Sequence, residues 1–102
     1  MRRYDLTSNA QRDLNAIVEY IAVEATVDQA IRVLTELRNA FRMLGEMPGM
    51  GHYRDDLLDR HYKFWSVHSY VVVYRWETTP IQIIAVVHGA RDLGAFLSRR
   101  DG

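Results

Sequence analysis

The first half of the chain carries apolar residues at helical spacing. Between residues 8 and 24 they recur every three or four positions, at Ala10, Leu14, Ile17, Val18 and Ile21. Between residues 27 and 46 the same spacing returns, at Val27, Ala30, Ile31, Leu34, Leu37, Phe41 and Leu44. Residues that recur at i, i+3, i+4 and i+7 share one face of an α-helix. The pattern therefore predicts two amphipathic helices.

Local signals set the limits of these helices. Residues 8–11, starting at Ser8, and residues 26–29, starting at Thr26, both fit a capping box, in which a hydroxyl and a side-chain amide bind free backbone amides. Pro48 disfavours helical geometry in the residue before it, so the second helix is expected to end near residue 46. Because so few residues separate the two apolar stripes, we expect an antiparallel helical hairpin.

The rest of the chain follows a period of two. In residues 2–7, Tyr4 and Leu6 fall on one side, and aromatic and β-branched residues alternate with others in residues 62–67 and 70–76, as is typical of strands. Residues 81–87 are nearly all apolar, which favours a central strand. A final short helix is predicted from the spacing of three apolar residues, with Asp92 placed to cap it: Leu93, Phe96 and Leu97.

These elements define the predicted fold class. Their order is β-α-α-β-β-β-α, within one domain of residues 1–102. We predict an α+β fold in which the helical hairpin packs on a mainly antiparallel sheet, followed by a short C-terminal helix.

Composition narrows the function classes. Thirteen basic residues balance thirteen acidic ones, whereas a nucleic-acid-binding protein normally has a basic surplus, so we expect no direct nucleic-acid partner. The sequence has no cysteine, which excludes disulfides and cysteine metal sites and favours a reducing compartment. No segment has the apolar length of a signal peptide or a membrane span. We therefore predict a cytoplasmic protein that does not enter a membrane.

The chain has four histidines, His52, His61, His68 and His88. Zinc sites need ligands that converge from close spacings or fixed elements, and no pair here has an HxH, HxxxH or HExxH arrangement. We predict no metal site and no cofactor.

A small polar cluster follows the last predicted strand and allows two interpretations. His88 could act as a general base beside Arg91 and Asp92. Alternatively, Asp92 caps the last helix and Arg91 pairs with Asp92 or a neighbouring acid, which fixes the strand-to-helix turn at Gly89. We favour the structural interpretation.

Several motifs, taken in order, resemble those of a known family. They are Tyr4-x-Leu-Thr7, Ala10-x-x-Asp-Leu14-x-x-Ile17-x-x-Tyr20, Leu44, Pro48-x-x-Gly51, Tyr70-Val-Val-Val-Tyr-Arg75 and Val87-His-Gly-Ala-Arg-Asp92. This ordered set, which spans nearly the whole chain, resembles the ParE toxins of bacterial toxin–antitoxin modules, within the RelE/ParE superfamily. The chain departs from the family pattern at Ser69, where members often have a basic residue.

The resemblance implies a function and two partners. It implies a toxin neutralised by a ParD-like antitoxin, whose C-terminal segment folds onto the toxin in a hetero-oligomer. The ParE branch is associated with poisoning DNA gyrase, and the RelE branch with cutting mRNA on the ribosome. We expect Arg54, His88 and Arg91 to contact the target, with no catalytic residue.

A ribosome-dependent endoribonuclease is the main alternative. Metal-independent RNA cleavage needs a base, an acid and cationic groups around the phosphate. The only candidates here are Lys63, Arg75, His88 and Arg91, which is a sparse set. A non-toxic adaptor with the same fold is a third alternative.

The aromatic residues of the predicted strands could stack on single-stranded nucleic acid, but aromatic residues in strands are usually core residues or cross-strand pairs. One face of the sheet must pack on the hairpin, and the other would expose more apolar area than a monomer normally tolerates. We therefore expect an antitoxin to cover an exposed apolar face that includes Tyr62, Phe64, Trp65, Tyr70 and Trp76.

Overall fold

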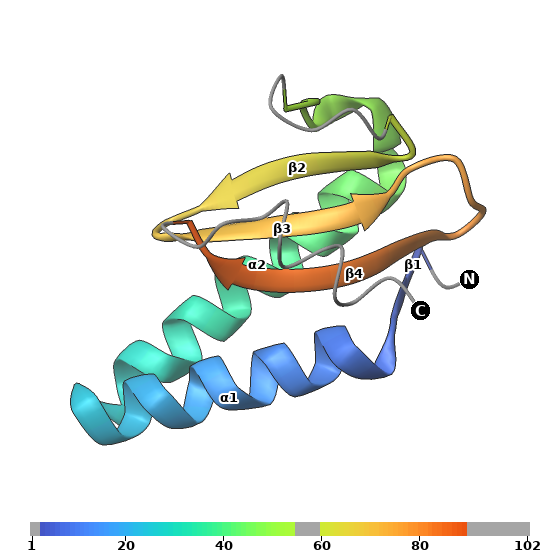
Figure 1. Cartoon of the computed structure of the whole chain (residues 1–102). Helices are drawn as coiled ribbons and strands as arrows, with labels where there is room; N and C mark the ends of the chain where they lie inside the picture. Colours follow the sequence, from blue (N-terminus) through green and yellow to red (C-terminus); the bar gives the residue numbers. More distant parts are fainter. Residues whose placement is uncertain (1–2, 55–59, 90–102) are drawn as a thin grey trace.

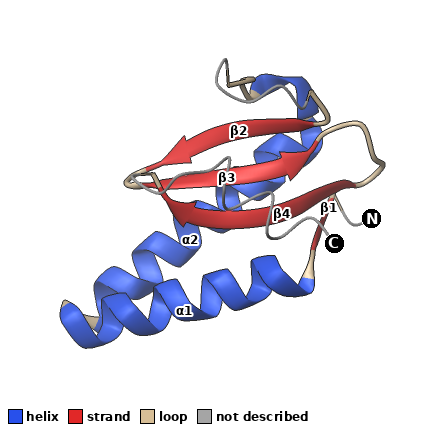
Figure 2. Cartoon of the chain, viewed as in Figure 1, coloured by secondary structure: helices blue, strands red, loops and turns tan. Residues whose placement is uncertain are grey.

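A long helical hairpin packs against a twisted four-stranded sheet (Figures 1 and 2). The computed structural model describes residues 3–54 and 60–89. Both predicted helices and all four predicted strands are present, so the α+β prediction is confirmed. The predicted C-terminal helix and its cap Asp92 lie outside the described residues. The elements are β1 (Tyr4–Leu6), α1 (Ser8–Glu24), α2 (Val27–Glu46), a 3₁₀ turn (Pro48–Met50), β2 (Tyr62–Val67), β3 (Tyr70–Arg75) and β4 (Ile81–His88).

The sheet is mainly antiparallel, with strand order β1-β4-β3-β2. β2 and β3 are joined by a tight turn at His68 and Ser69, where His68 has a φ of 54°. β3 pairs antiparallel with β4, and β1 pairs parallel with β4 from Tyr4↔Ile81 to Leu6↔Ile83. A parallel pair needs a long crossover, which here includes both helices. The helical hairpin consequently lies against one face of the sheet (Figure 1).

Threonine side chains begin both helices. At α2 the N-cap is Thr26, as predicted, and its Oγ1 accepts a hydrogen bond from the Gln29 amide at 3.0 Å. At α1 the predicted cap Ser8 is wrong, because the N-cap is Thr7, whose Oγ1 accepts from the Ala10 amide at 3.1 Å. The Thr7 hydroxyl also donates to the Ile84 carbonyl at 3.3 Å. Since Thr7 directly follows β1, its side chain reaches both the helix and β4.

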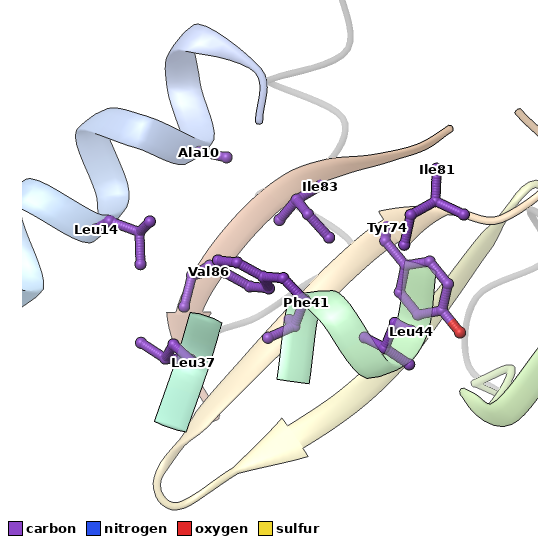
Figure 3. Close-up of a cluster of buried hydrophobic side chains, with 10 residues drawn as sticks. Ala10, Leu14, Leu37, Phe41, Leu44, Tyr74, Ile81, Ile83 and Val86 are labelled. Carbon is purple, nitrogen blue, oxygen red and sulfur yellow. The ribbon is translucent and has the colours of Figure 1, made fainter. Parts of the chain in front are cut away.

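The main core fills the layer between the helices and the sheet (Figure 3). Tyr4 of β1 adds its ring to this layer, 5.4 Å from the ring of Phe41. Ten residues are buried there: Ala10, Leu14, Leu37, Phe41, Leu44, Val72, Tyr74, Ile81, Ile83 and Val86.

The apolar stripe of α2 is buried only in part. Val27 and Ile31 belong to the stripe read from the sequence, yet they are 61% and 56% exposed. The reason is visible in Figure 1, where the connected end of the hairpin projects past the sheet. The apolar stripe of α2 therefore continues past the part of the helix that packs on the sheet.

A second buried cluster lies on the sheet face away from the helices. It contains Tyr62, Phe64, Val71, Val73, Ala85 and Val87. Tyr62 and Phe64 are only 8% and 5% exposed. The guanidinium groups of Arg75 and Arg54 lie over these two rings, at 5.4 and 5.9 Å from the ring centres. The predicted exposed apolar sheet face is therefore wrong.

A buried tyrosine fixes the segment that follows α2. The Tyr74 hydroxyl donates to the Pro48 carbonyl at 2.7 Å and accepts from the Gly51 amide at 2.9 Å. A Cβ atom at position 51 would overlap that hydroxyl, so the close approach requires glycine. Burial raises the pKa of Tyr74 above its ordinary value, with the Gly51 hydrogen bond opposing and the nearby Tyr53 adding to the rise. This anchor positions residues 52–54, including Arg54.

In the described part of the chain, no helix is both long enough and apolar enough to cross a bilayer.

Candidate functional site

Two of the three predicted target-contacting residues lie in the described chain, and they are far apart. The Arg54 guanidinium covers Phe64 on β2, whereas His88 ends β4 and faces the Tyr70 ring edge-on at 6.0 Å. β3 separates β2 from β4, and Phe64 is level with Ala85, three residues before His88, so the two sites are at least about 10 Å apart. Arg91 lies outside the described residues. The structure therefore does not bring Arg54 and His88 together.

The described nuclease candidates also point to different places. Lys63 contacts the Gly51 carbonyl, while Arg75, on the neighbouring strand, donates to the Tyr62 hydroxyl at 3.2 Å in the far-face cluster. His88 pairs with the first residue of β3 and Arg75 is the last, so about 17 Å of strand separates them. No common point lies within hydrogen-bond reach of Lys63, Arg75 and His88.

Each histidine has a different local contact. His52 stacks on Trp65 with ring centres 5.9 Å apart, and His61 Nδ1 lies 2.8 Å from Glu77 Oε1. His68 pairs with Glu36 of α2, which ties the β2–β3 turn to the hairpin. Within residues 3–54 and 60–89, no three His, Asp or Glu side chains are grouped as a metal site.

A groove of about 460 Å³ runs between α1 and β4. Its α1 wall includes Asp13, Ile17 and Tyr20, and its other wall includes Tyr70 and the end of β4. Asp13 Oδ2 accepts a hydrogen bond from the Val86 amide at 3.0 Å, which fixes the helix beside the strand. Burial raises the pKa of the Tyr70 hydroxyl, and the nearby Tyr20 adds to the rise. The groove is mainly apolar, with the Tyr70 hydroxyl and the His88 imidazole at one end.

Sequence reasoning missed this groove, although a signal for it was present. Asp13 and Tyr20 both belong to the motif quoted above for residues 10–20. Asp13 lies three residues after Ala10 and four before Ile17, so it shares the inward face of α1 with them. A carboxylate on an inward face needs a donor, which here is a backbone amide of the sheet.

Large apolar side chains are exposed at the connected end of the hairpin. Tyr20 and Val23 of α1 are 64% and 75% exposed, and Val27 and Ile31 of α2 are 61% and 56% exposed. Because Tyr20 also lines the groove, the exposed apolar surface of α1 continues from the groove toward the hairpin end.

The five aromatic residues assigned to an antitoxin do not share one surface. Tyr62 and Phe64 are buried on the far face, whereas the other three pack on the helix side and are partly exposed. Only Tyr70 lines the groove. Their contact with an antitoxin stays a prediction.

A cluster of cations and aromatic rings lies beside β2. The Lys63 Nζ atom is 4.1 Å from the ring centre of Tyr53 and 5.0 Å from that of Trp76. Arg60 lies over the same Tyr53 ring at 4.6 Å, and its carbonyl accepts from the Trp76 indole at 3.0 Å. We call these four residues the Lys63 cluster. Each cation–ring contact stabilises the cluster by about 0.5–2 kcal/mol, depending on how far water is excluded.

Comparison with known proteins agrees with the motifs. Residues 4–93 match the sequence profile of the family described as ParE toxin of type II toxin–antitoxin system, parDE. The chain is 34% identical over 97 residues to Toxin ParE1 of Caulobacter vibrioides, covering 95% of this chain and 99% of that protein. It also matches a chain of the solved chromosomal ParDE TA system from P. aeruginosa, with a TM-score of 0.70 and 17% identity over 83% of this chain and 92% of that chain.

Proposed function

Because this chain belongs to the ParE toxin family of type II toxin–antitoxin systems, we propose that it inhibits DNA gyrase by binding and is neutralised by a ParD-like antitoxin. That the chain is a ParE-type toxin follows from the family itself. The target, the non-catalytic mode of action and the antitoxin are the proposal.

The observation that supports binding over catalysis is the separation of the cationic side chains. Phosphodiester cleavage requires its base and its cations within hydrogen-bond reach of one phosphate. Lys63 and Arg75 lie on opposite faces of the sheet, and His88 lies at the far end of β3 from Arg75. Three groups so placed cannot act on one phosphate without rearranging the sheet.

For the antitoxin, we propose the groove between α1 and β4 together with the exposed hairpin end. An amphipathic segment binds most strongly where apolar side chains are accessible but not yet buried. Tyr20 and Val23 meet that condition, whereas Tyr62 and Phe64 are already buried in this chain. Of the aromatic residues predicted from the sequence, Tyr70 stays in this surface, and the partly exposed Trp65 and Trp76 stay weaker candidates.

The function is tested by two assays run side by side on the purified chain. One measures DNA supercoiling by gyrase, and the other measures cleavage of mRNA during translation. We expect inhibited supercoiling and intact message. In an Arg54→Ala variant we expect inhibition to weaken at least about tenfold, which is the usual loss for a charge-assisted contact. Arg32→Ala, on an exposed position of α2, serves as the matched control and should inhibit like the wild type.

Other outcomes would move the protein to another class. Cleaved message with normal supercoiling would place it with the endoribonucleases and make His88 and Arg91 catalytic candidates. Activity in neither assay would favour the non-toxic adaptor. Loss of folding must be separated from loss of binding, because Arg54 covers Phe64 and its removal is expected to cost about 0.5–1 kcal/mol. A thermal unfolding curve for each variant provides that control.

A further inference from the structure

The Lys63 cluster has a feature that packing alone does not explain. The Lys63 residue is only 9% exposed, and it is the one charged residue classed as buried in the described chain. An ammonium group has three donors. Among residues 3–54 and 60–89, its one hydrogen bond runs to the Gly51 carbonyl at 3.5 Å, the outer limit of such a bond. Buried charges in proteins are normally paired with an opposite charge.

No carboxylate of the described residues pairs with the cluster. Glu77, which follows Trp76 in the chain, contacts His61 instead. Arg60 adds a second cation over the Tyr53 ring, so two positive groups share one aromatic neighbour. The rings of Tyr53 and Trp76, edge-to-face at 6.3 Å, form the apolar wall beside them. The cluster thus offers a positive, partly dehydrated position in which an anion would bind strongly.

We propose that the Lys63 cluster binds a carboxylate side chain, an Asp or Glu, of a protein partner. Lys63 would hold the carboxylate at depth, and the exposed Arg60 would contact it from the surface. This site lies on β2, on the far side of β3 from the groove and β4, so it extends the proposed function and does not depend on the identity of the target.

Two observations favour a carboxylate over a nucleic-acid phosphate. Lys63 is recessed, and a carboxylate at the end of a flexible side chain can reach it, whereas a backbone phosphate is flanked by sugars on both sides. The chain also has a net charge of zero, so it lacks the basic field that holds a polyanion.

The site is tested by titrating the ¹⁵N-labelled full chain with a blocked tetraglutamate peptide at constant ionic strength. The Trp76 indole N–H is the reporter, because it belongs to the cluster and donates to Arg60. Blocked tetraglutamine and a short oligothymidine provide the uncharged and the phosphate probes. We expect a saturable shift of the Trp76 signal with tetraglutamate and none with tetraglutamine.

Substitutions then assign the binding to this cluster. Lys63→Met keeps the length of the side chain but removes the charge, and we expect the dissociation constant to rise at least about tenfold. Arg60→Gln, at an exposed position, should raise it about threefold and keeps the test valid if Lys63→Met does not fold. Arg32→Gln on α2 is the matched control and should change nothing.

Several results would overturn the proposal. They are an absent or non-saturable shift, equal binding by both cluster variants and the wild type, or a response to oligothymidine alone, which would mean a nucleic-acid contact. None of these results depends on gyrase inhibition. A chain that inhibits gyrase but does not bind tetraglutamate would refute this site and leave the proposed function intact. A chain that binds tetraglutamate but does not inhibit gyrase would support this site and refute the proposed function.

Discussion

The two ends of the helical hairpin differ sharply although they carry the same sequence pattern. At the end near the sheet, Ala10, Phe41 and Leu44 are fully buried. At the connected end, Val27 and Ile31 belong to the apolar stripe of α2 and are more than half exposed. The helices are longer than the sheet they cover (Figure 1). Folding of this chain alone therefore accounts for only part of its apolar helix surface, and the remainder is available to a partner.

The largest expected effect comes from shortening an apolar side chain at each end. Phe41→Ala should lower the free energy of unfolding by about 3–5 kcal/mol, because it leaves a cavity in a core that cannot close around it. Ile31→Ala should change it by less than about 0.5 kcal/mol, because the side chain is already in water. Chemical denaturation of both variants measures the two values. Similar losses at both positions would show that the hairpin end is packed in solution and would remove the distinction.

A smaller difference is expected between the two helix caps. Thr26 at the connected end serves only as an N-cap, and Thr26→Ala should cost about 0.5–1 kcal/mol. Thr7 at the sheet end caps α1 and also donates to the Ile84 carbonyl, so Thr7→Ala should cost about 1 kcal/mol more. Thermal unfolding of the matched pair compares the two values. Equal costs would mean that the contact between Thr7 and β4 contributes nothing to stability.

The smallest effect on stability is expected where the largest effect on antitoxin binding should occur. Tyr20→Ser and Val23→Ser replace exposed apolar side chains on α1, and each should shift the free energy of unfolding by less than about 0.5 kcal/mol. Each should weaken binding of the proposed ParD-like antitoxin about tenfold or more, since a buried aromatic or branched side chain can dominate an interface. Calorimetric titration with the antitoxin measures this, with Arg12→Ser on the same helix as control. Unchanged affinity in both apolar variants would place the antitoxin on another surface.

The helices and strands could be predicted from the sequence because each type of element has its own periodicity. The limits of α2 follow from Thr26 and Pro48, which act on their immediate neighbours. The N-cap of α1 was misplaced by one residue because Thr7 and Ser8 both carry a hydroxyl, and only the contact with β4 distinguishes them. Periodicity also cannot reveal where a sheet ends beneath a helix, which is why the apolar stripe of α2 includes the exposed Val27 and Ile31.

The candidate sites were harder to predict from the sequence because they depend on the face of the sheet to which each side chain points. Alternation shows that neighbouring strand residues point to opposite sides, but it does not show how two strands align. Lys63 and Arg75 were grouped as cations, yet the register pairs Lys63 with Tyr74, and the two cations point to opposite faces. The partners of Lys63 come from positions 53, 60 and 76, whose approach only the folded chain reveals.

The hydrogen bond between Asp13 and the Val86 amide also covers part of the β4 edge. In the described part of the chain, β1 pairs with β4 only as far as Ile83. The Val86 amide, which follows on the same side of β4, therefore lies at a sheet edge that no strand covers. Unpaired sheet edges can pair with strands from other molecules, which is a common cause of aggregation. The carboxylate of Asp13 accepts the hydrogen bond that an intruding strand would need. A side chain of α1 thus closes the stretch of β4 that the short strand β1 leaves unpaired.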